Sequence, residues 1–69
     1  MAAAQKAVKA VTLKRRAARH EASAELLADA AARFDREGSG DAARMALHGC
    51  RMHRTWAIQM RALAVVAPE

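Results

Sequence analysis

Apolar positions in the first half of the chain recur at alternating intervals of three and four residues. The stripe consists of Ala10, Leu13, Ala17, His20, Ala24, Leu27, Ala31 and Phe34. This spacing places the residues on one face of a helix. Every second member is alanine, which is typical of a heptad seam where two helices approach closely. Frequent alanine alone explains part of this regularity, but the larger residues share the register.

Glycine and proline divide the chain once. Gly38-Ser39-Gly40 separates two segments rich in strong helix formers, and Pro68 closes the second segment. Gly38 suits a left-handed position after a helix, and Ser39 or Asp41 suits the next N-cap. The pattern predicts an all-α fold, a single-domain antiparallel hairpin over residues 1–69. We expect helices near 3–37 and 41–66.

The second predicted helix carries apolar residues on two sides. One side is the seam Met45, Gly49, Met52, Trp56, Gln59, Leu63 and Val66. Leu47, Ile58 and Val65 fall on another side, among arginines. Two apolar sides indicate two contacts, one within the hairpin and one with another chain. Isolated surface residues are the alternative explanation for Leu47 and Ile58.

The chain is short for a stable monomer. It has 69 residues, of which 20 are alanine, and a single cysteine that excludes an internal disulfide. Small scaffolds without disulfides commonly gain stability by oligomerisation. We therefore expect a homo-oligomer, most simply a dimer forming a four-helix bundle. The predicted protein interface comprises Leu13, Leu27, Phe34, Met45, Leu47, Met52, Trp56, Ile58, Leu63 and Val65.

Positive charge gathers at the N-terminal end. Residues 1–20 contain six basic and no acidic side chains, within a chain of net charge +5. The candidate set for binding nucleic acid or an acidic partner is Lys6, Lys9, Lys14, Arg15, Arg16, Arg19, Arg54 and Arg61. Such a patch attracts phosphate backbones in a salt-dependent way, although a solvated surface explains it equally well. The two aromatic residues fall on predicted seams, so base-specific stacking is not expected.

A weaker signal is a run of possible metal ligands. His48, Cys50, Met52 and His53 lie within six residues, and Glu25 is expected across the hairpin from His53. These side chains point to different sides of the predicted helix and do not supply the four ligands of a structural zinc site. A structural role is therefore favoured, and no cofactor is expected.

The sequence contains no recognisable set of catalytic residues, which predicts a protein that is not an enzyme. The lone cysteine favours a reducing, cytoplasmic location, and the apolar runs are too short for a membrane span. The basic first twenty residues mimic a transit peptide, but their removal would leave too little chain to fold.

The leading functional hypothesis is a small adaptor or regulatory subunit that binds a partner protein through apolar helix faces. A dimeric nucleic-acid-binding regulator and a helical metal-binding protein are the alternatives. No motif identifies a family. The layout of two helices with alanine layers and a basic face resembles the Rop-type plasmid copy-number regulators, which implies a dimeric four-helix bundle binding RNA. It equally resembles the helical-hairpin co-chaperones of type III secretion, which implies a protein partner.

Overall fold

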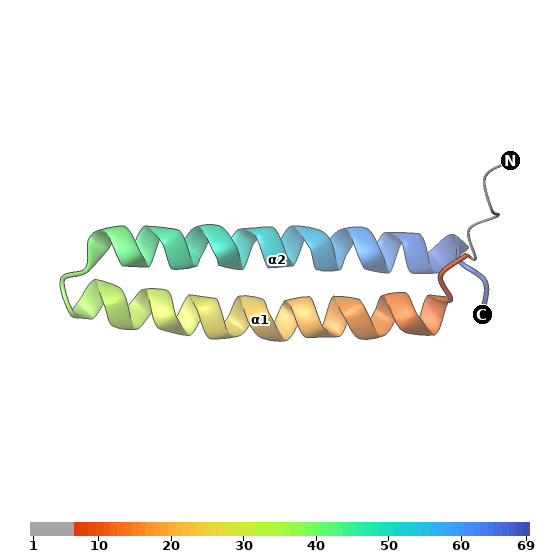
Figure 1. The fold of residues 1–69 in the computed structure, drawn as a ribbon, viewed down its shortest axis with the longest axis horizontal. Coiled ribbons are helices and arrows are strands. Elements are labelled where there is room, and N and C mark those ends of the chain that lie inside the picture. Colours follow the sequence, from red (N-terminus) through yellow and green to blue (C-terminus); the bar gives the residue numbers. More distant parts are fainter. Residues whose placement is uncertain (1–6) are drawn as a thin grey trace, which may run out of the picture.

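Two antiparallel helices form the structure, a computed structural model that describes residues 7–69. Helix α1 spans Ala10–Arg36 and α2 spans Gly40–Val66, each 27 residues long. They lie side by side along their whole length, and both ends of the described chain lie at the end opposite the turn (Figure 1). Residues 7–69 contain no strand. The predicted all-α hairpin is therefore confirmed.

The first helix begins later than the expected residue 3. Residues 7–9 are not helical, and Lys9, with φ −68° and ψ 148°, is extended. Residues 3–6 of the expected helix lie outside the described residues. Because α2 ends at Val66, a longer α1 would have no helix to pack against, and tertiary packing supplies most helical stability. The Ala10 N–H instead donates to the Pro68 carbonyl at 2.7 Å, which joins the two ends of the hairpin.

The turn follows the predicted chemistry. Gly38 has φ +79°, a left-handed conformation that costs glycine little. The Ser39 N–H donates to the Phe34 carbonyl at 2.8 Å, and the Gly38 N–H donates to the Asp35 carbonyl at 3.1 Å. This pair of bonds is the Schellman motif, which satisfies carbonyls at the end of α1. Ser39 is the N-cap residue of α2, although its side chain makes no capping hydrogen bond.

Small side chains fill the space between the helices. Within residues 7–69, eight of the ten buried apolar residues are alanines, and the set is Ala10, Leu13, Ala17, Ala24, Ala31, Ala43, Ala46, Cys50, Ala57 and Ala64. The members from α1 belong to the predicted stripe, whose remaining positions, including His20 and Phe34, are half-buried. The predicted contact face of the first helix is thus confirmed.

The contact face of α2 differs from the predicted seam. Ala43, Ala46, Cys50, Ala57 and Ala64 face α1, whereas the seam residues flank this line and are largely exposed. The exposed fractions of Met45 and Leu63 are 76% and 56%. Because alanines on both helices allow a close approach, larger side chains do not fit between them and project at the sides.

This packing predicts a sharp difference between two neighbouring alanines. Ala17 is fully buried against α2, and Ala18 is exposed. Ala17→Leu forces extra methylenes into the narrow interface and should lower the free energy of unfolding by about 1–3 kcal/mol. Ala18→Leu adds the same volume on the solvent side and should change it by less than ~0.5 kcal/mol. Chemical denaturation measures both, and equal effects would contradict the alanine interface.

Candidate protein-binding faces

The hairpin presents two broad sides, and one of them is apolar. On this side Leu27 covers Gly49, where a Cβ atom would lie 3.0 Å from Leu27 Cδ1. The rings of His20 and Trp56 meet on it with centroids 5.3 Å apart. Helical steps of about 100° per residue place the other large seam residues on the same side. We call this surface the apolar face, and its larger members are Leu27, Phe34, Met45, Met52, Trp56 and Leu63.

Charged residues lie mainly at the margins of the apolar face. Along Gly40–Val66, helical geometry directs no charged side chain to its middle. From α1 and its two cap residues it receives one column with seven-residue spacing, made of Lys9, Arg16, Ser23, Ala30 and Glu37. Ser23 and Ala30 in this column are half-buried, and the charged members are exposed. The column is therefore basic near the chain ends, uncharged in the middle and acidic at the turn.

A ring cluster occupies the centre of the apolar face. His20 and His53 approach with 2.7 Å between their Nδ1 atoms, and Trp56 meets the ring of His53 edge-on at 5.2 Å. One Nδ1 must carry the proton and the other must accept it, because two protonated Nδ1 atoms cannot form this bond. Both histidines are half-buried. The cluster is a polar contact between the helices within an otherwise alanine-rich interface.

The predicted metal ligands are not assembled. The fold brings His20 to His53, whereas Glu25 was the expected neighbour and is exposed. Cys50 points into the helix interface with 2% exposure, and His48 and Met52 are exposed. Within residues 7–69, no three His, Cys, Asp or Glu side chains lie close enough together to hold a metal ion. The missed partner, His20, carried a signal in the sequence, since it occupies the predicted stripe of the first helix.

The opposite side of the hairpin is charged. Arg61 donates to both carboxylate oxygens of Glu21, at 2.8 Å from Nε and 2.6 Å from Nη2. The hydrogen bond from Arg61 lowers the pKa of Glu21 below its ordinary value and raises that of Arg61 itself. Arg61 was expected to extend the basic surface, but Glu21 neutralises it. On α2, Arg44 also pairs with Asp41 near the turn.

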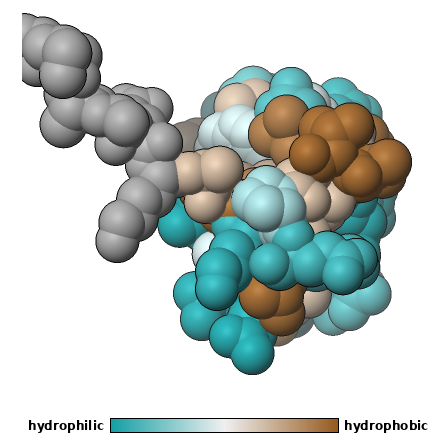
Figure 2. Space-filling model, turned by 90° about the vertical axis from the view of Figure 1, so that its right-hand side faces the viewer, coloured by the Kyte–Doolittle hydropathy of each residue, from teal (hydrophilic) through white to brown (hydrophobic). Residues whose placement is uncertain are grey.

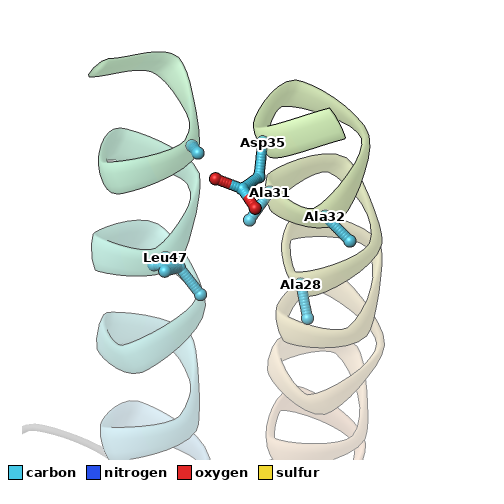
Figure 3. Close-up of a pocket in the computed structure, with 6 residues that line it drawn as sticks. Ala28, Ala31, Ala32, Asp35 and Leu47 are labelled. Carbon is cyan, nitrogen blue, oxygen red and sulfur yellow. The ribbon is translucent and has the colours of Figure 1, made fainter. Parts of the chain in front are cut away.

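A shallow pocket lies on this charged side near the turn. Alanines line most of it, and Leu47 forms one wall (Figure 3). Asp35 directs its carboxylate toward α2 across the pocket (Figure 3). Leu47, Ile58 and Val65 are exposed by 40%, 70% and 84%, and helical geometry places them along this edge of α2. We call these three residues the leucine-isoleucine-valine strip.

The basic candidates remain accessible to solvent. Lys9, Lys14, Arg15, Arg16 and Arg19 are all exposed on or just before α1. Arg54 is exposed on α2, and Lys6 lies outside the described residues. The basic side chains point in several directions around α1 and form no single line.

The end of the hairpin that carries the termini is partly apolar. Figure 2 looks onto this end and shows one large apolar patch beside hydrophilic surface. A shallow groove here is lined by residues from both ends of the described chain, namely Ala7, Val8, Leu13, Leu63, Val66, Ala67 and Pro68. Leu63 belongs to the apolar face as well, so the groove continues that face to the end of the hairpin.

Comparisons with known proteins add no relative. No family model, curated protein or solved structure matches the chain. Neither α1 nor α2 has the length and hydropathy needed to cross a membrane.

The histidine contact predicts a non-additive mutational response. His20→Leu removes one partner and leaves a half-buried Nδ1 of His53 without its bond, so it should cost about 1–2 kcal/mol of unfolding free energy. His53→Leu should cost a similar amount. The double variant replaces both polar groups and should cost clearly less than the sum, because paired removal leaves nothing unsatisfied. Chemical denaturation of the four proteins measures the coupling, and strict additivity would show that the contact is unimportant.

Proposed function

We propose that this chain is a small non-enzymatic adaptor or regulatory subunit that acts by binding another protein through its apolar helix surfaces. The observation that carries this proposal is that small side chains are buried between the helices while large apolar side chains are exposed. Alanines occupy the interior, while Met45, Ile58 and Val65 are 70–84% exposed. Large exposed apolar surfaces mark interaction sites in soluble proteins.

The two sides of α2 support two separate contacts. The leucine-isoleucine-valine strip and the apolar face lie on opposite flanks of the alanine line, so one chain can use both at once. A homodimer is the simplest use of one flank, which leaves the other for a different protein. Ile58 is the central residue of the strip and 70% exposed, and residues near the centre of an interface tend to carry most of its binding energy.

The adaptor proposal predicts a position-specific loss of binding. Ile58→Glu places a charge in the strip and should reduce capture of the partner protein from the native host at least tenfold, through desolvation of that charge. Ala62→Glu is the matched control, since Ala62 is exposed on the same helix and faces away from both flanks. The measurement is quantitative capture after nuclease treatment. Capture of the same proteins by both variants and the parent would contradict the proposal.

A nucleic-acid-binding regulator is the second candidate. The observation in its favour is the exposure of Lys14, Arg15, Arg16 and Arg19 on two adjacent turns of α1, with no acidic residue between Ala10 and His20. Backbone phosphates would be the ligand, because charge that wraps a helix gives affinity with little sequence preference.

This second candidate predicts a salt-dependent response. The triple change of Arg15, Arg16 and Arg19 to Gln should weaken binding to labelled duplex DNA or RNA and flatten its salt slope between about 50 and 200 mM salt. The matched control changes Arg33, Arg36 and Arg51 to Gln, which removes the same charge elsewhere on the exposed surface. Fluorescence anisotropy measures both. Equal losses would show only a net-charge effect, and dissociation of the triple variant into monomers would assign these arginines to a subunit interface.

A further inference from the structure

Within residues 7–69 no segment covers the apolar face, whose exposed side chains and charge distribution suit a copy of itself. We propose that a second copy of the chain packs on the apolar face, face to face, with the two turns at opposite ends of a four-helix bundle. The inference rests on the proposed protein-binding function and names the partner of one of its two surfaces. The leucine-isoleucine-valine strip stays exposed on the outside of such a dimer.

The shape of the face supports a copy in this orientation. Ser23 is the middle residue of α1, and His53 is the middle residue of α2. A two-fold axis through the middle of the face, perpendicular to the helices, stacks α1 on α1 and α2 on α2 in antiparallel directions. Met45 then lies within one helical turn of Leu63 of the second copy, and Met52 lies within one turn of Trp56. The four side chains are each 38–76% exposed in the single hairpin, so the dimer would bury apolar surface that water now contacts.

Charge distinguishes this orientation from the alternative with both turns at one end. On the side of the axis that carries the chain ends, residues 7–22 and 54–69 together contain seven basic and two acidic side chains, for a net charge of +5. On the side of the turn, residues 24–52 contain four basic and five acidic side chains, for a net charge of −1. Turns at one end would stack the two strongly positive halves on each other, which is unfavourable at short range. Opposite turns place each positive half on the nearly neutral half of the other copy.

The column of Lys9, Arg16, Ser23, Ala30 and Glu37 on the face agrees with the same orientation. Lys9 and Glu37 are equally distant from Ser23, by fourteen residues in each direction. With the axis at Ser23, Lys9 of one copy lies beside Glu37 of the other, and Arg16 lies beside the neutral Ala30. With the turns together, α1 stacks on α2 of the second copy, and this pairing is lost.

Site-specific disulfides test the orientation. Ser23→Cys should form a disulfide with itself across the axis, because the two Cβ atoms face each other, and Cys50 is buried and should not compete. Ala18→Cys is the control on the outer surface and should remain reduced. A second cysteine pair tests the same orientation far from Ser23. When the Lys9→Cys and Glu37→Cys variants are mixed, they should form a disulfide with each other. A parent dimer in which neither expected disulfide forms would overturn the antiparallel arrangement.

Sedimentation tests the second copy itself. The parent should be a dimer at micromolar concentration, Met52→Glu should shift it to monomer, and Ile58→Glu should leave it dimeric. A parent that stays monomeric at about 100 µM would overturn the inference and would assign the apolar face to a different protein. The adaptor proposal is tested independently of the dimer, because Ile58→Glu should reduce capture of the partner protein without changing the oligomeric state. If the parent is a monomer that captures a partner protein and Ile58→Glu does not capture it, the adaptor proposal is supported and only the dimer is refuted.

Discussion

Close contact between two lines of alanine is the constraint on which the rest of the structure depends. An interface made of methyl groups brings the helix backbones near each other but removes little apolar surface from water, since each side chain is small. The larger apolar residues cannot enter this interface and lie on its two flanks. The same feature that makes the hairpin slim therefore leaves large apolar side chains exposed on both flanks. Small side chains fill the interior and large apolar side chains lie on the surface, which is the reverse of the usual arrangement.

The first helix was largely predictable because its stripe contains an independent signal. Leu13, Leu27 and Phe34 keep the register of the alanines, so the pattern identifies one face. The turn was predictable for a chemical reason, since Gly38 suits the left-handed conformation that the Schellman motif requires. The start of α1 was not predictable from propensity. It depends on where α2 ends, and that limit is a tertiary property.

The contact face of the second helix was not predictable from hydrophobicity, because its largest apolar residues do not face α1. Hydrophobic periodicity assumes that the largest apolar residues face the interior. In α2 they form a regular seam, yet the buried residues are Ala43, Ala46, Cys50, Ala57 and Ala64. The His20–His53 contact was missed because pairing across a hairpin depends on the relative shift of the helices. That shift determines which residue lies opposite His53 and cannot be obtained by counting outward from the turn.

The histidine contact has a consequence for how the chain selects one alignment. Alanines recur along both helices, so sliding α2 by one heptad against α1 would again place methyl groups on methyl groups. The misaligned hairpin would separate His20 from His53 and would place a side chain, in place of Gly49, beneath Leu27. These two contacts, together with the Arg61–Glu21 pair and the hydrogen bonds of the turn, distinguish the native alignment from its shifted copies. A shifted hairpin would keep the alanine packing but lose the histidine contact and the close fit at Gly49, so these contacts favour a single alignment of the two helices.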